Sequence, residues 1–273
     1  MTAATTTAKK QQDNNGSSWF PYIVIPVCFL VTFGLFNIVF GNPKNFVDGD
    51  PTKEPIDGNI IGTIYKGGVI VPILQGLLLI VLVFIVERFY TLGRAKGTGN
   101  IDQFVKSIKS FLDKGDINGA LVACDKQKGS IANVVRAGLE KYNEMETTTD
   151  MDTEHKVLAI QKEIEEATTL ELPMLEKNLN ILATIASVAT LLGLLGTVIG
   201  MIRAFGALAH AGAPDSTALA TGISEALINT AFGIGTSALA IIAYNFFTAR
   251  IDTMTYRIDE AGYTITQTFA AKH

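Results

Sequence analysis

The 273-residue sequence has few charged residues, few cysteines and no excess of positive charge. Asp, Glu, Lys and Arg make up 18% of the chain, against about 25% in ordinary soluble proteins. The two cysteines, Cys28 in an apolar stretch and Cys124 in a charged one, argue against a disulfide scaffold. A net charge of −4, with no block of basic residues, argues against nucleic-acid binding.

The charges that are present avoid four long stretches, residues 18–41, 67–86, 178–202 and 216–249, in which only Glu225 is charged. A bilayer core requires about 20 helical residues to cross it, and in lipid the backbone must satisfy its own hydrogen bonds. Each stretch is therefore expected to be a transmembrane helix. Four buried helices of a large soluble core are the alternative, which uncharged runs of this length disfavour. The first stretch is too long for a secretory signal and is expected to be a retained anchor.

These patterns predict an all-α integral membrane protein with four transmembrane helices and a helical inner region. Lys and Arg near the ends of the spans are more frequent on the side that holds both termini, which predicts that both termini lie inside. Arg203 is one of the basic residues on the outer side. A helix that begins near Val157 is expected to run straight into the third span, with a bend at Pro173.

The predicted segments follow one another along the whole chain. They are an inner tail (1–17), the first span (18–41), an outer loop rich in Asp, Gly and Pro (42–66), the second span (67–92), the helical inner region (93–177), the third span (178–206), an outer turn (207–215), the fourth span (216–249) and an inner C-terminal helix (250–273).

Glu225 is the candidate functional residue of the spans. A charged side chain at mid-bilayer costs about 2.5–3.5 kcal/mol on insertion scales, and such residues usually mark an ion or proton path. The alternative is a position near the outer end of the helix, from which the carboxylate reaches water. Helical spacing places four further residues on one stripe with Glu225, and Thr230 borders this stripe. The four residues are Asn229, Gly233, Thr236 and Ala240.

Hydroxyl and small residues also recur in the third span. Thr190 and Thr197 are seven residues apart, a spacing that suits the lining of an aqueous passage, and Gly196 and Gly200 form a G-x-x-x-G pair. Ordinary helix packing is the alternative for each of these residues. Two polar helices cannot enclose a pore, so we expect a channel to form between several copies of the chain, or between copies and another helix.

No enzymatic constellation is evident in the sequence. The three histidines, His155, His210 and His273, all lie outside the predicted spans, and no metal-ligand spacing or phosphate-binding loop is present. We therefore do not expect an enzyme.

Specific motifs occupy the third and fourth spans. The third contains LGLLGTVIGM (192–201) and the fourth contains EALINTAFG (225–233), while GDINGALVAC (115–124) and VER (86–88) lie upstream. Together they resemble the ExbB/TolQ/MotA proton-channel family, most closely its ExbB branch. By motif position, the resemblance implies that Glu225 is the family's membrane glutamate and that Thr197 and Thr230 are its lining threonines.

The resemblance also implies a cellular role. It implies a subunit of the bacterial inner membrane in which a ring of several copies, typically a homopentamer, surrounds a dimer of a single-span ExbD-type partner. The proton motive force would then energise TonB-dependent outer-membrane transport through a TonB-like protein, with the proton as the translocated ion and no cofactor. On this reading the inner region is cytoplasmic and the outer segments are periplasmic.

Two features depart from the family pattern, and two other functions stay open. An additional span, 18–41, precedes the matching region, and Asn229 stands where a small apolar residue is common. Asn229 is four residues after Glu225 and is expected to hydrogen-bond its carboxylate. A TolQ-like or motility-type stator is one alternative function, and a non-conducting membrane scaffold is another.

Overall fold

The computed structural model describes residues 19–208 and 215–273. Within these ranges the chain is helical and forms no β-strand, apart from an isolated bridge between Phe46 and Pro55. The all-α class predicted from the sequence is confirmed. The predicted tail, 1–17, and most of the predicted turn, 207–215, lie outside the described residues.

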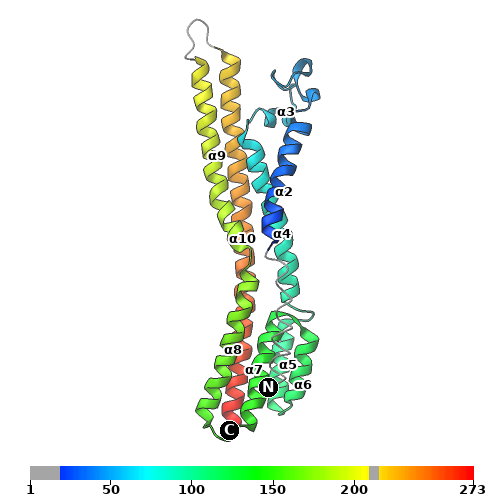
Figure 1. Cartoon of the computed structure of the whole chain (residues 1–273), viewed down its shortest axis with the longest axis vertical. Coiled ribbons are helices and arrows are strands. Elements are labelled where there is room, and N and C mark those ends of the chain that lie inside the picture. The colour runs from blue at the N-terminus through cyan, green and yellow to red at the C-terminus, as the bar shows by residue number, and fades with distance from the viewer. Residues whose placement is uncertain (1–18, 209–214) are drawn as a thin grey trace. The chain divides into compact units, whose positions relative to one another are not determined.

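In the described part of the chain, four helices are long and apolar enough to cross a membrane. They are α2 (Phe20–Leu35), which continues as the π-helix η2 (Phe36–Phe40), α4 (Ile70–Ala95), α9 (Leu179–Leu208) and α10 (Ser216–Lys272) (Figure 1). The four helices expected from the uncharged stretches are therefore present. The chain after Ala249 does not start a new helix, because α10 continues without a break to Lys272.

The chain divides into two compact units. The membrane unit comprises the described residues up to Phe84 and those within Asn180–Ile242, and the polar unit comprises Ile85–Leu179 and Ala243–His273. Each unit contains parts of α4 and α10, since both helices continue from one unit into the other.

Close contacts at glycines hold the membrane unit together. The helices α9 and α10 are antiparallel neighbours, and a Cβ atom added to Gly233 would lie 2.7 Å from the carbonyl oxygen of Ala189. A Cβ atom added to Gly76 of α4 would lie 2.5 Å from the ring of Phe29 on α2. Outside these helices, the short helices are η3 (Pro43–Asn45), η4 (Val47–Gly49) and α3 (Ile60–Tyr65).

The polar unit is a helical bundle formed by α5 (Ile101–Asp113), α6 (Ile117–Gln127), α7 (Gly129–Thr147) and α8 (Thr153–Glu176) with the ends of α4 and α10. Side-chain oxygens of Asn100, Asp116 and Asp152 accept hydrogen bonds from backbone amides at the starts of α5, α6 and α8, as N-cap residues do. The fully buried side chains include Ile108, Leu112, Leu139, Tyr142, Ile160 and Phe269.

The prediction that one helix runs from Val157 into the third span is wrong. The helix α8 contains Pro173 but ends at Glu176, and α9 begins at Leu179. Asn178 between them has a φ of 66°, a left-handed conformation that asparagine tolerates better than most residues. The buried guanidinium of Arg88 donates to the carbonyl oxygen of Leu175 at 3.2 Å and so satisfies a carbonyl of the last turn of α8.

Candidate functional site

Glu225 of α10 is buried in the membrane unit and forms an ion pair with Arg203 of α9. The Arg203 Nη1 atom donates to both carboxylate oxygens, at 2.5 and 2.8 Å. The Glu225 side chain is 6% exposed, whereas that of Arg203 is 55% exposed. The acid that stood alone in the uncharged stretches therefore has a cationic partner, which lowers the cost of its burial.

The segment that leads into α4 packs closely against this carboxylate. Gly68 has a φ of 78°, and a Cβ atom added there would overlap Oε1 of Glu225. A side chain at this position would therefore be strained by the backbone conformation and would also displace the carboxylate. A glycine is thus required at position 68 for two reasons: the positive φ of its backbone and the lack of space beside the Glu225 carboxylate.

Asn229 connects the same segment to α10. Its Nδ2 atom donates to the carbonyl oxygen of Gly67 and to the backbone carbonyl oxygen of Glu225, both at 2.9 Å. Its Oδ1 atom is buried and has no hydrogen-bond partner among the described residues. The expectation that Asn229 binds the Glu225 carboxylate is wrong, because the amide takes the backbone carbonyl four residues back while the carboxylate turns to Arg203.

Thr197 of α9 and Thr230 of α10 meet across the seam between the two helices. Their hydroxyl groups are hydrogen-bonded to each other. Thr197 also donates to the carbonyl oxygen of Gly193 at 3.1 Å, and Thr230 to that of Ala226 at 3.0 Å. Thr230 is five residues beyond Glu225 on α10, which corresponds to about 7.5 Å along the helix axis.

The other predicted site residues are three glycines at close contacts between helices and two threonines. Cβ atoms added at Gly196, Gly200 and Gly233 would overlap Asn229, the backbone at Ala226 and the backbone at Gly193, respectively. Thr190 donates to the carbonyl oxygen of Ala186 one turn earlier, at 3.4 Å. Thr236 is buried, and its hydroxyl has no partner among the described residues.

Two polar residues of this seam were not singled out by the sequence reasoning. Arg203 was assigned to the outer flank, and its pairing with Glu225 depends on the antiparallel register of α9 and α10. Ser237 is buried and donates from Oγ to the carbonyl oxygen of Ala186 at 2.5 Å. The polar groups thus follow the α9–α10 seam from Arg203 and Glu225, through Asn229 and the two threonines, to Ser237.

Other kinds of chemistry find no support in the described part of the chain. Residues 19–208 and 215–273 contain no group of three or more His, Cys, Asp or Glu side chains able to hold a metal ion. Burial raises the pKa of the Cys124 thiol to about 12. This thiol is therefore protonated at neutral pH and is a poor nucleophile.

Four apolar helices with a buried acid–hydroxyl seam define a polytopic membrane protein of the transport class. Residues 126–260 match the MotA/TolQ/ExbB proton channel family. The chain belongs to this family, which is a family of membrane transport proteins and not a class of enzymes. The match includes the end of α6, all of α7, α8 and α9, and α10 up to Glu260.

Relatives carry the names of two branches of the family. The Tol-Pal system protein TolQ of Pseudomonas aeruginosa is 29% identical over 171 residues, which are 63% of this chain and 72% of that protein. TolQ of Haemophilus influenzae is 42% identical over 84 residues, 31% of this chain and 37% of that protein. The biopolymer transport protein ExbB of Xanthomonas campestris is 31% identical over 111 residues, 41% of this chain and 44% of that protein. The similarities do not separate the ExbB branch from the TolQ branch.

Proposed function

We propose that the chain is the proton-channel subunit of an ExbB–ExbD-type motor in the bacterial inner membrane, which uses the proton motive force to energise TonB-dependent outer-membrane transport. The observation that supports this most is the buried Glu225 carboxylate, followed along one seam by the paired hydroxyls of Thr197 and Thr230. An acid in a span is costly and is usually retained for ion or proton transfer. The working assembly is a pentameric ring around a dimer of the single-span partner, with both termini in the cytoplasm and no cofactor.

The geometry around Glu225 suggests how a proton is loaded. Its carboxylate is deprotonated while it accepts both hydrogen bonds from Arg203. The guanidinium stays charged at any physiological pH, so protonation of Glu225 removes the attraction between the two side chains. Arg203 is the more exposed member of the pair and is the one able to move away. Proton uptake at Glu225 thus competes with the ion pair.

The protonated acid is followed by groups that can relay a proton. The hydroxyls of Thr197 and Thr230 each act as donor and acceptor, so together with water they continue a hydrogen-bonded path along the seam. Release of the proton restores the carboxylate and its attraction for Arg203. In the proposed motor, this alternation between a paired and an unpaired acid moves the ring relative to its partner.

Replacing Glu225 with Gln tests the proposed function. The substitution keeps the shape of the side chain and removes the proton-carrying group, so energy-dependent outer-membrane transport should be lost in cells that carry only this variant. Membrane insertion and oligomer size should be unchanged, as measured by fractionation and by native mass spectrometry. The control is Asp252→Asn, an exposed acid on the same helix, which should retain transport. Full transport in the Glu225→Gln variant contradicts the proposal.

Arg203→Gln tests the proton-loading step. Without the guanidinium, the carboxylate exchanges protons without displacing a cation, so the proton leak of the resting complex in proteoliposomes should rise severalfold. Arg203→Lys preserves the positive charge and should remain near the wild-type leak. An unchanged leak in Arg203→Gln would show that the ion pair plays no part in proton loading. This result would not contradict the proposed motor function, which the Glu225→Gln variant tests separately.

A TolQ-like role is the second candidate, and the TolQ relatives favour it. Expression in strains that lack their own ExbB or TolQ separates the two, because the first strain reports uptake of iron complexes or vitamins and the second reports outer-membrane integrity. A non-conducting scaffold is distinguished by the proton leak of the reconstituted complex, which would be the same for wild type and for Glu225→Gln.

A further inference from the structure

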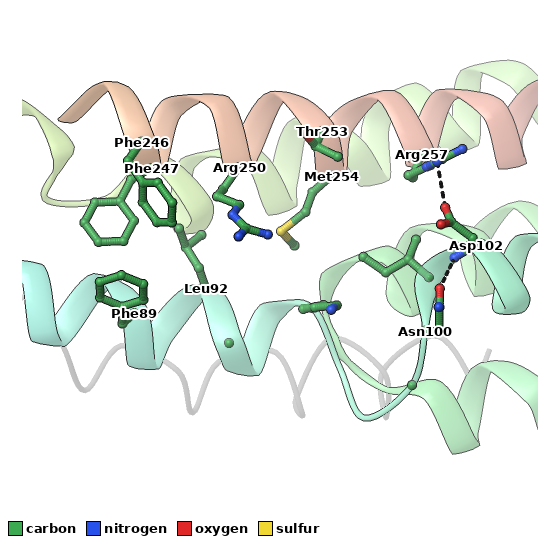
Figure 2. Close-up of a pocket in the computed structure, with 14 residues that line it drawn as sticks. Phe89, Leu92, Asn100, Asp102, Phe246, Phe247, Arg250, Thr253, Met254 and Arg257 are labelled. Carbon is green, nitrogen blue, oxygen red and sulfur yellow. Dashed lines mark hydrogen bonds and ion pairs between the residues drawn. The ribbon is translucent and has the colours of Figure 1, made fainter. Parts of the chain in front are cut away.

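A cavity of about 700 Å³ lies in the polar unit, between the end of α4 and the middle of α10 (Figure 2). Its volume is within the roughly 300–1,000 Å³ typical of small-molecule sites. The lining residues fall in 89–102 and 246–257, at the ends of the uncharged stretches 67–86 and 216–249. The cavity therefore lies where these two helices are expected to leave the hydrocarbon core and enter the headgroup region.

One end of this cavity is apolar. Phe89 of α4 faces Phe246 and Phe247 of α10, with ring centroids 5.5 and 5.0 Å apart, and Figure 2 shows the three rings grouped at this end. Leu92 and Met254 continue the apolar wall. Gly93 also lines the cavity, and a Cβ atom added to it would meet no atom within 4 Å.

Basic residues line the rest of the cavity: Arg250 lies in its middle, between the rings and Met254, and Arg257 lies at its far end (Figure 2). Its charged lining residues are Lys96, Arg250, Arg257 and one acid, Asp102. Arg257 is bound to Asp102 at 2.7 Å and to Glu260 at 2.6 Å, so its charge is compensated. The Arg250 guanidinium lies 5.2 Å from the Phe246 ring centroid, and neither it nor the Lys96 amine forms an ion pair with a described residue. Two cations are thus left to bind an anion.

The two helices present these groups in the same order. On α4 the aromatic Phe89 precedes Lys96, and on α10 the aromatic Phe246 precedes Arg250. In both cases the ring lies nearer the membrane span and the cation lies farther from it. This is the order in which a phospholipid places its acyl chain and its phosphate, and basic pockets between membrane helices are known to bind anionic headgroups.

We propose that this cavity binds an anionic glycerophospholipid, with the phosphate between Lys96 and Arg250 and an acyl chain along the three phenylalanines. The site is independent of the Glu225 seam, since it belongs to the polar unit and shares no residue with that seam. A bound lipid would fill a cavity beside helices that the motor must hold firmly. The lipid thereby becomes a structural ligand of the subunit.

Native mass spectrometry of the full-length chain in detergent, titrated with phosphatidylglycerol or with phosphatidylcholine, tests this proposal. The wild type should bind phosphatidylglycerol about tenfold more tightly, as two cations near a headgroup would provide. The Lys96→Gln/Arg250→Gln double variant should bind the two lipids within about twofold of each other. Arg94→Gln is the matched control, since Arg94 is also a basic residue at the end of α4 but does not line the cavity.

A second variant tests the apolar end without changing charge. Gly93→Leu fills open space in the cavity and should lower the affinity for phosphatidylglycerol severalfold, whereas Gly34→Leu, at another open position on α2, should not.

The proposal is overturned if the double variant keeps its preference, or if Gly93→Leu binds like the wild type. It is also overturned if millimolar inorganic phosphate displaces the lipid, which would indicate a soluble phosphate ligand. A change in the number of copies without a change in lipid preference would overturn it too, because the cavity would then be an interface between copies.

Discussion

The membrane unit and the polar unit hold their helices together with different kinds of residues. In the membrane unit, α9 and α10 approach each other at glycines, and their seam encloses Glu225, Asn229 and Thr236. In the polar unit, the helices meet through large apolar side chains such as Leu139, and the ring of Tyr142 packs edge-on against Phe269 with centroids 4.8 Å apart. Small residues and polar groups thus form the α9–α10 seam, although α4 also buries large side chains such as Leu74 and Phe84, whereas large apolar groups fill the core of the polar unit.

The difference follows from the solvent that surrounds each unit. In lipid, an apolar side chain gains nothing by turning inward, so helices associate through close backbone contact and polar interactions. Leu191 of α9 and Ile242 of α10 accordingly remain more than 60% exposed. In water, burial of apolar surface is the main driving force, and the large side chains turn inward. The long helices α4 and α10, which have parts in both units, therefore follow different packing rules along their length.

The largest effect is expected from Gly233→Leu in the membrane unit. Its Cβ atom would lie 2.7 Å from backbone atoms of α9, which cannot move without separating the helices. The loss of stability should reach about 3 kcal/mol or more, the upper end of overpacking costs. Thermal unfolding in detergent measures it, with Gly235→Leu as the control because an added Cβ there meets nothing within 4 Å. Equal melting temperatures for both variants would contradict the close packing of α9 and α10.

A comparable effect is expected from Leu139→Ala in the polar unit, where a fully buried leucine leaves a cavity. The expected loss is about 2–5 kcal/mol. Leu158→Ala, at a position 61% exposed, should stay within about 0.5 kcal/mol of the wild type. Leu191→Ala in the membrane unit should also be mild, and a large loss there would show that the two units do not differ as described.

A smaller effect is expected from Asn229→Ala, which removes hydrogen bonds to Gly67 and to the backbone of Glu225. Such bonds in membrane proteins contribute about 0.6 kcal/mol on average and about 1.7 kcal/mol at most. Thr236→Val is a useful comparison. The buried hydroxyl of Thr236 has no partner in the described chain, so its loss should be neutral or stabilising. Both variants are measured by the same unfolding assay. A cost above about 3 kcal/mol for Asn229→Ala would exceed any ordinary hydrogen bond.

Several features of the fold could be predicted because they depend on local sequence. The four long helices follow from uncharged stretches, and helix starts such as that of α8 follow from cap residues such as Asp152. The break at Lys177 and Asn178 could not be predicted, because the left-handed φ of Asn178 and the bond from Arg88 to a carbonyl of α8 are evident only in the folded chain. The Thr197 and Thr230 positions came from the resemblance, and their direct contact came from the structure.

The sequence by itself determined which segments are helical and apolar, because each amide in lipid must bond within its own helix and charges are excluded from the hydrocarbon core. It also determined that Glu225 would need a compensating environment, since a lone buried charge is costly. Only the tertiary structure decided that Arg203 pairs with the carboxylate and that Gly68 packs against it. It likewise decided that Lys96 and Arg250 share a cavity. These pairings join residues distant in the chain, and their register is set by how whole helices pack against each other.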